Sequence, residues 1–354
     1  MIGRRALLAG MGGLLAAPAF AQDMPSLRGL AASRGLVFGS ATATYELKDA
    51  DFARLLPREA AILVPEYELK RNVVEPAPGR FDFSASDALM DFAHAHGMAM
   101  RGHPLVWYYA NPPWLEDAVL RSPNEKPLAD YVGALASRYR GRMHSWDVVN
   151  EALAPDGSGL RPGIWLKRYG PSYIDIAFHA AHAADPAALL VYNDFGCEQG
   201  ANDRFRAQTL KLLDGLLARA VPVQAVGLQG HLSAFGSKVD QKKLRDFLGE
   251  IHARHLGVLI TELDVDDENG PMDGAARDRA VADEATRFLD VVLDSPALSA
   301  ILTWGLTDRY LDPPDSLKLK LLGWRARKLP FDAALNRKPL WQALARAFSA
   351  KPAY

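Results

Sequence analysis

The stretch His144-Ser-Trp-Asp-Val-Val-Asn-Glu151 decides the fold, because it joins an apolar strand to a polar end. Val148 and Val149 suit a parallel strand that is covered on both faces. Asn150 and Glu151 follow at the point where such a strand should end and a loop begin. In parallel barrels, an acid at the carboxyl end of a strand is typical of a catalytic residue. The stretch therefore predicts an acid that faces an open site.

Further apolar runs occur on both sides of this stretch, and helical patterns lie between them. Apolar residues spaced by three and four favour the helices. Strand and helix alternate eight times over about 270 residues, which predicts a single α/β domain with the (β/α)8 TIM-barrel fold. A doubly wound open sheet is the alternative, but its usual glycine-rich first turn is missing. The predicted strands are Gly35–Ser40, Ala61–Pro65, Met98–His103, Ser145–Val149, Leu189–Asn193, Ala225–Gln229, Val258–Thr261 and Ala300–Leu306. The predicted helices are Ser84–His96, Leu128–Arg140, Ser172–Ala184, Asp203–Ala220, Gln241–His255, Ala276–Asp294 and a closing helix at Lys338–Phe348.

The first residues have the pattern of an export signal. Arg4 and Arg5 precede an Ala/Leu/Gly-rich segment that ends in Ala19-Phe20-Ala21, an A-x-A cleavage signature. We expect residues 1–21 to be a signal peptide and residues 22–354 to form the catalytic domain. The paired arginines favour twin-arginine export, and an ordinary Sec signal is the alternative. The mature protein is then expected to be periplasmic or secreted, with no membrane association.

Composition and charge exclude several classes of partner. Among 354 residues, 49% are apolar and 23% are charged, as in ordinary globular proteins. Removal of residues 1–21 leaves 39 basic and 42 acidic side chains, a net charge of −3, which gives no electrostatic case for nucleic-acid binding. The single cysteine, Cys197, excludes an intrachain disulfide. The histidine pairs lack the other ligands of a metal site. We expect a monomer without metal or cofactor.

Polar and aromatic side chains collect at the ends of the predicted strands. Because the carboxyl ends of barrel strands meet at one face, we expect these side chains to share one site. They are Glu66 on strand two, His103 on strand three, Asn150 and Glu151 on strand four, Asn193 and Asp194 on strand five, Gln229 and His231 on strand six, Glu262 on strand seven and Trp304 on strand eight. Of these, Asp194 is expected to serve the structure and not catalysis.

Glu151 and Glu262 form a pair of acids, 111 residues apart, at this face. A strand-end acid can also cap the following helix, but two glutamates across a pocket are the apparatus for cleaving a glycosidic bond. One carboxyl donates a proton to the leaving oxygen, and the other attacks the anomeric carbon or activates water. A carboxyl separation of about 5–5.5 Å corresponds to retention and about 6.5–9.5 Å to inversion, and the sequence leaves this distance open.

The motifs around these residues resemble the strand-end motifs of family-ten glycoside hydrolases, the retaining endo-β-1,4-xylanases. The resemblance covers nearly the whole mature chain in the expected order. The motifs are Glu66–Lys70, Arg101-Gly-His-Pro-Leu-Val-Trp107, Trp146-Asp-Val-Val-Asn-Glu151, Gly227-Leu-Gln-Gly-His231, Ile260-Thr-Glu-Leu-Asp264 and Thr303-Trp-Gly-Leu-Thr-Asp308.

The resemblance implies a role for each matched residue. Glu151 would be the general acid/base and Glu262 the nucleophile. Asn150 would bind the 2-hydroxyl of the sugar that is cleaved. His231 would donate a hydrogen bond to Glu262 and keep it ionised, while Asp264 orients the imidazole. The other substrate-binding residues would be the polar Glu66, Lys70, His103 and Gln229 and the aromatic walls Trp107 and Trp304.

Departures from the family pattern concern substrate recognition and leave the two glutamates intact. Tyr67 replaces an asparagine, Arg71 a tryptophan and Tyr108 a histidine. The segment Arg309–Pro314 lacks the usual Ser-Trp pair, so this wall is missing or is supplied by residues such as Tyr310 or Trp324. The first strand lacks the usual Asp-Asn.

The prediction is therefore an exported retaining endo-β-1,4-xylanase that acts on xylan or xylooligosaccharides. One alternative is the same mechanism on another β-linked glycan, such as a β-glucan or an aryl β-glycoside. A second alternative is a non-catalytic protein that binds xylan oligosaccharides.

Overall fold

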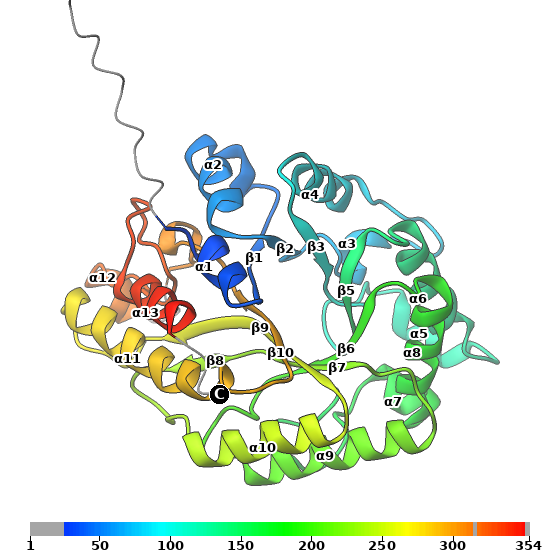
Figure 1. Ribbon diagram of the computed structural model, residues 1–354. Coiled ribbons are helices and arrows are strands. Elements are labelled where there is room, and N and C mark those ends of the chain that lie inside the picture. Colours follow the sequence, from blue (N-terminus) through cyan, green and yellow to red (C-terminus); the bar gives the residue numbers. More distant parts are fainter. Residues whose placement is uncertain (1–24, 314–316, 351–354) are drawn as a thin grey trace, which may run out of the picture.

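The computed structural model describes residues 25–313 and 317–350. Within these residues the sheet has ten parallel strands, of which β4 and β8 are short extensions. The remaining eight follow one another in chain order, and β10 pairs with both β1 and β9, which closes the barrel (Figure 1). The predicted TIM barrel is confirmed, and each predicted strand overlaps an observed one. The strands are β1 (Val37–Thr42), β2 (Ile62–Pro65), β3 (Ala99–Gly102), β4 (Val106–Trp107), β5 (Met143–Asn150), β6 (Leu189–Asp194), β7 (Ala225–Leu228), β8 (His231–Ser233), β9 (Gly257–Asp266) and β10 (Leu298–Thr303).

The two short strands lengthen the barrel wall at the carboxyl ends of the long strands. Strand β4 pairs with the end of β5, where Trp107 lies opposite Asn150. Strand β8 pairs with the end of β9, where His231 lies opposite Asp264. Both extensions therefore carry predicted site residues to the same mouth.

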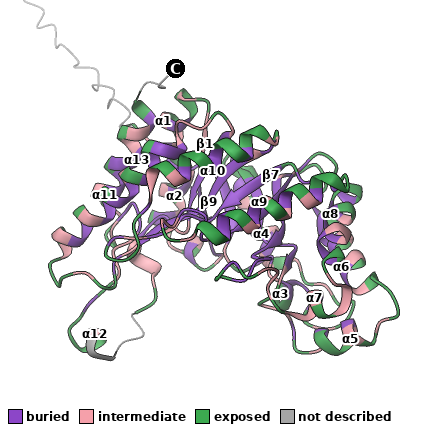
Figure 2. Ribbon diagram, turned by 90° about the horizontal axis from the view of Figure 1, so that it is seen from below, coloured by how far each residue is buried: buried purple, intermediate pink, exposed green. Residues whose placement is uncertain are grey.

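Helices surround the barrel, and their outward faces are exposed while the strands at the centre are buried (Figure 2). Each predicted helix is present, with ends that differ by a few residues. The predicted helices correspond to α4 (Ser84–Ala95), α6 (Lys126–Arg138), α8 (Ser172–Ala184), α9 (Asp203–Ala218), α10 (Gln241–Ala253), α11 (Gly274–Val292) and α13 (Pro339–Ser349). Unpredicted helices are α1 (Leu27–Ser33), α2 (Ala50–Glu59), α3 (Arg71–Val74), α5 (Leu115–Arg121), α7 (Ile164–Tyr169) and α12 (Leu317–Leu321), and short 3-10 turns lie at Glu46–Lys48 and Asp308–Tyr310.

The apolar core has two parts, as expected for a barrel with a covered outer face. A small cluster fills the interior, with side chains such as Ile62, Val191 and Leu259. A much larger cluster lies between the strands and the helices. An eight-stranded barrel is just wide enough for its own side chains, so the interior contains small and medium residues.

The predicted signal peptide, residues 1–21, lies outside the described residues. Among the residues that are described, no helix combines the length and the apolar character needed to cross a membrane.

The narrow barrel interior leaves no room for a side chain at Gly39 of β1. A Cβ atom at Gly39 would lie 2.7 Å from the backbone oxygen of Ile62 and 2.2 Å from its Cγ2 atom. Gly39→Ala should therefore lower the free energy of unfolding by about 1–3 kcal/mol, measured by urea denaturation. Gly133→Ala in α6 is the control, because no atom lies within 4 Å of its Cβ position, and it should be neutral or stabilising. Equal effects at the two positions would contradict this account.

Candidate active site

The structure brings the predicted site residues together at the carboxyl-terminal mouth of the barrel. Some lie directly after a strand, as Glu66 does after β2, His103 after β3, Gln229 after β7 and Trp304 after β10. Trp107 and Asn150 are the last residues of β4 and β5, and Glu151 directly follows β5. His231 is the first residue of β8, and Glu262 and Asp264 lie in the second half of β9. Lys70 immediately precedes α3.

Asn193, at the end of β6, links the surroundings of the two glutamates. Its Nδ2 donates hydrogen bonds to Glu262 Oε1 and to Asn150 Oδ1, each at 2.8 Å. The Thr261 hydroxyl donates to Asn193 Oδ1 at 2.7 Å, which fixes the orientation of the amide. Asn193 was predicted to lie at a strand end, but no role was predicted for it. The signal in the sequence for a role of Asn193 was its place among the polar residues that end the predicted strands.

Side-chain amides hold the carboxyl group of Glu151. Gln229 Nε2 donates to Glu151 Oε1 at 3.1 Å, and Asn150 Nδ2 donates to the same oxygen at 3.2 Å. Gln229 Nε2 also lies 3.4 Å from Asn150 Oδ1. One hydrogen-bonded network therefore runs from Glu151 through Asn150 and Asn193 to Glu262.

The backbone of Glu151 has a left-handed conformation, with φ of 56°. This conformation costs a residue other than glycine about 1–3 kcal/mol and persists only where its surroundings hold it. Glu151 N donates to Asn193 O at 2.8 Å, and Arg161 Nε donates to Glu151 O at 3.0 Å. Arg161 also lies with Nη2 3.7 Å from Glu151 Oε2, and its guanidinium packs over the Tyr108 ring at 4.2 Å. Tyr108 therefore supports a residue that contacts Glu151, which the sequence alone did not indicate.

Glu262 is a buried carboxylate that is surrounded by donors. His231 Nε2 donates to Glu262 Oε2 at 3.3 Å, and His103 Nδ1 lies 3.9 Å from Oε1. Burial by itself raises the pKa of Glu262, but the His231 hydrogen bond, the charges of both histidines and the Asn193 bond together lower it below its usual value. Glu262 is therefore held in its ionised form.

A row of alternating charges continues away from Glu262. His231 Nδ1 donates to Asp264 Oδ1 at 2.8 Å, and Lys328 Nζ donates to Asp264 Oδ2 at 2.6 Å. Burial alone lowers the pKa of His231, but the charges and hydrogen bonds of Asp264 and Glu262 raise it well above its usual value. Burial alone raises the pKa of Asp264, yet His231 and Lys328 lower it to about 2. The role predicted for Asp264, to orient the imidazole, agrees with this geometry, whereas Lys328 was not predicted.

His103 is fixed between two tryptophans and a buried acid. Its Nδ1 donates to Asp147 Oδ2 at 2.9 Å, and Asp147 is also paired with Arg101. The ring of His103 lies edge-on to Trp304 at a centroid distance of 5.3 Å and is tilted toward Trp107 at 6.5 Å. The three predicted residues His103, Trp107 and Trp304 therefore form one wall of the site.

Lys70 lies over two aromatic rings beside this wall. Its Nζ is 4.5 Å from the centroid of Tyr67 and 5.4 Å from that of Trp107. Burial lowers the pKa of Lys70, although Glu66 and Glu262 act in the opposite direction. Arg71, by contrast, is buried in packing, with Nε bonded to Glu75 at 2.9 Å and its guanidinium 3.9 Å from the Tyr131 ring. The departure at Arg71 is thus a change in packing and not a new contact surface of the site.

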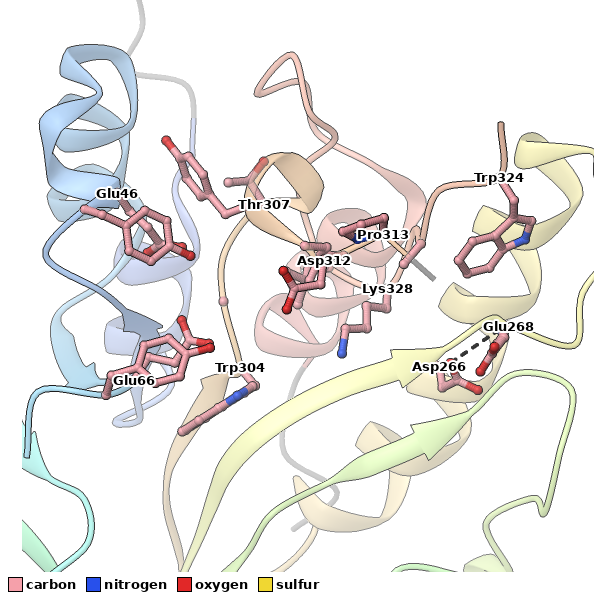
Figure 3. Close-up of a pocket in the computed structure, with 17 residues that line it drawn as sticks. Glu46, Glu66, Asp266, Glu268, Trp304, Thr307, Asp312, Pro313, Trp324 and Lys328 are labelled. Atoms are coloured by element: carbon pink, nitrogen blue, oxygen red, sulfur yellow. Dashed lines mark hydrogen bonds between the residues drawn. The ribbon is translucent and has the colours of Figure 1, made fainter. Parts of the chain in front are cut away.

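A pocket of about 710 Å³, which we call the rim pocket, opens from Glu66 and Trp304. Figure 3 shows Glu46 and Glu66 on one side, Asp266, Glu268 and Trp324 on the other, and Lys328 between them. Tyr310 and Trp324, named as possible replacements for the missing wall, both line this pocket. Among residues 25–313 and 317–350, no group of three His, Cys, Asp or Glu side chains is arranged to hold a metal ion.

Comparisons with known proteins agree with this geometry. The family model described as Glycosyl hydrolase family 10 matches residues 26–347. The chain is 32% identical over 330 residues to endo-1,4-beta-xylanase B of Thermotoga neapolitana, and this match covers 91% of each chain. It is 31% identical over 339 residues to endo-1,4-beta-xylanase 1 of Humicola insolens, which covers 94% of this chain and 75% of the relative.

Solved structures show the same fold. Native xylanase 10B from Thermotoga maritima superposes with a TM-score of 0.81 at 30% identity and covers 92% of this chain and 98% of that one. Xylanase 10B from Thermotoga petrophila RKU-1, crystallised with xylobiose, also gives a TM-score of 0.81, at 29% identity, and covers 92% of this chain and 97% of that one. With the family match over nearly all the described residues, the chain belongs to glycosyl hydrolase family 10.

Proposed function

We propose that the protein is a retaining endo-β-1,4-xylanase that hydrolyses internal bonds of xylan or xylooligosaccharides. The observation that carries the proposal is the different setting of the two glutamates in one network. Glu262 is held ionised by His231 through a hydrogen bond, whereas the Glu151 carboxyl accepts its hydrogen bonds from two neutral amides and has the Arg161 guanidinium 3.7 Å away. Family membership and the names of the relatives support xylan as the substrate. Export of the enzyme is a proposal that depends on residues 1–21 alone.

The proposed reaction has two displacements. In the first, Glu262 attacks the anomeric carbon while Glu151 donates its proton to the glycosidic oxygen. The glycosidic bond breaks, the leaving chain departs with that proton, and the sugar is covalently bound to Glu262. In the second, water attacks the same carbon, Glu151 accepts a proton from the water, and Glu262 leaves as a carboxylate.

The surrounding polar groups are proposed to bind the sugar on which this chemistry occurs. Asn150 has its amide beside Glu151 and can reach the 2-hydroxyl group, a contact that strengthens in the oxocarbenium-like transition state. Gln229 and His103 approach from β7 and β3 to hydrogen-bond other hydroxyls. Glu66 lines the rim pocket, and Lys70 lies over the ring of Tyr67, which also lines it. Both residues are proposed to bind the next sugar. Trp107 and Trp304 provide flat apolar walls.

The same mechanism on a β-1,4-glucan is the second candidate, and the rim pocket favours it. Asp312, in the segment that lacks the usual Ser-Trp pair, lines this pocket, as do Trp304 and Leu329. A glucosyl unit differs from a xylosyl unit by one hydroxymethyl group, and apolar pockets discriminate such groups by only about 1–3 kcal/mol. A higher kcat/KM on β-glucan than on xylan would favour this candidate.

Loss of the proposed nucleophile tests the mechanism. Glu262→Ala should lower kcat on xylan or an aryl xylobioside by about 1,000-fold or more, because the covalent step needs that carboxylate. Glu250→Ala, an exposed glutamate on α10, is the matched control and should retain the activity of the wild type. Turnover by the Glu262 variant at the level of the control would rule out the assignment.

The charge of His231 predicts the acid side of the pH profile. His231→Ala removes the cation and hydrogen bond that lower the pKa of Glu262, so burial will raise that pKa. Since Glu262 must be ionised to attack, the acidic limb of kcat/KM should move to higher pH. His252→Ala on α10, an exposed helix position, should leave the limb in place. An acidic limb that stays at the wild-type pH in the His231 variant would show that the imidazole does not keep Glu262 ionised.

A further inference from the structure

We propose that the rim pocket admits neutral sugars and neutral branches and excludes sugars that bear a carboxylate, such as uronic acid substituents of xylan. The inference rests on the proposed function and adds a rule for which decorated chains the enzyme accepts. It depends on three properties of the rim pocket, namely its continuity with the candidate active site, its aromatic lining and its charge.

The rim pocket is continuous with the candidate active site. Glu66 and Trp304 belong to both, and the ring of Trp304 contacts His103 at 5.3 Å. Figure 3 shows Trp304 beside Glu66 at one end of the pocket and Trp324 at the far side. A volume of about 710 Å³ exceeds what one sugar ring fills, since pockets of about 300–1,000 Å³ hold ligands of drug size. A bound chain therefore has room there for a further sugar or a branch.

Aromatic rings give this pocket affinity for sugars. Tyr45 and Tyr67 line it and are 48% and 45% exposed, and Lys70 Nζ lies over one face of the Tyr67 ring at 4.5 Å. Tyr310 lies edge-on to Tyr45 at 6.0 Å and is anchored by a 2.9 Å hydrogen bond from its hydroxyl to Asp49. A pyranose ring has apolar C–H faces and polar hydroxyl groups at its edge. A tyrosine, with an apolar ring face and a polar hydroxyl, can contact both parts of such a sugar. Tyr67, which replaces the family asparagine, thus offers a stacking surface in place of an amide.

The charge of the lining is strongly one-sided. Five acids line the pocket, namely Glu46, Glu66, Asp266, Glu268 and Asp312. Among the described residues that line it, Lys328 is the one cation, and it is already paired with Asp264 at 2.6 Å. Burial raises the pKa of Glu46 to about 8, so this acid is mostly neutral at pH 7, and burial also raises the pKa of Glu66. Of the other three acids, Asp266 is partly buried, and Glu268 and Asp312 are exposed.

This combination separates neutral from acidic sugars. Carboxylates accept hydrogen bonds from sugar hydroxyls, so a neutral glycone or branch gains partners in the pocket. A uronate would bring a negative charge into a concave surface of the same sign, and clefts with one sign of charge concentrate their field. Asp312 and Glu268 are therefore assigned as specificity-determining residues.

The test compares kcat/KM of the mature enzyme on linear xylooligosaccharides, arabinoxylan and glucuronoxylan, with analysis of the products. We expect efficient cleavage of the linear and arabinosylated chains, and glucuronoxylan products in which no uronic acid lies on the glycone side of the cleaved bond. Asp312→Lys together with Glu268→Lys should raise the ratio of glucuronoxylan to linear rates by about five-fold. High salt should reduce the difference between the wild-type rates on linear xylooligosaccharides and on glucuronoxylan, because salt screens exposed charges.

Controls separate this inference from the proposed function. Asp246→Lys, an exposed position on α10, makes the same charge change outside the pocket and should leave every ratio at its wild-type value. Asp312→Asn provides a milder variant if the double reversal does not fold, and it should move the ratio in the same direction. Equal wild-type rates on linear and glucuronosylated chains, unchanged in the variants, would overturn the inference while xylan hydrolysis still supported the proposed function. Absence of activity on every chain would overturn both.

Discussion

The site depends on the ionised carboxylate of Glu262 at a buried position. Removal of an ionised carboxylate from water costs several kcal/mol unless an opposite charge and hydrogen bonds compensate for it. The row of alternating charges Lys328, Asp264, His231 and Glu262 provides that compensation, with contacts of 2.6, 2.8 and 3.3 Å. Each member stabilises the charge of the next one. A nucleophile that is both buried and ionised is therefore a property of the whole row and not of one histidine.

The barrel makes this row possible through the register of two strands. Glu262 and Asp264 are two residues apart on β9, so their side chains point to the same face. The short strand β8 pairs with the end of β9 and sets His231 opposite Asp264. On the other side of the site, the strained backbone of Glu151 is held by Asn193 of β6 and by Arg161. Both glutamates are thus positioned by neighbouring elements more than by their own segments.

Much of this arrangement could be predicted from the sequence. The period of apolar runs predicted the barrel, and the polar residues at strand ends predicted the mouth and the two glutamates. Asn193 was predicted to lie at the mouth but without a role, and Arg161 and Lys328 were not predicted as site residues. Their contacts depend on side-chain directions and on loops that return from distant parts of the chain. Arg71 illustrates the opposite error, since a change in a substrate-binding motif proved to be a buried packing contact with Tyr131 and Glu75. A sequence shows which residues end the strands, whereas the side-chain contacts across the mouth of the barrel are seen only in the structure.

The charge of His231 is the most direct test of this account. Histidine labelled with ¹⁵N allows the protonation of both ring nitrogens to be followed by NMR as the pH is raised in the folded enzyme. The account predicts that His231 remains protonated on both nitrogens at pH 7 and titrates well above the usual histidine pKa of about 6.5. A neutral His231 at pH 7, with a titration at or below that value, would contradict it.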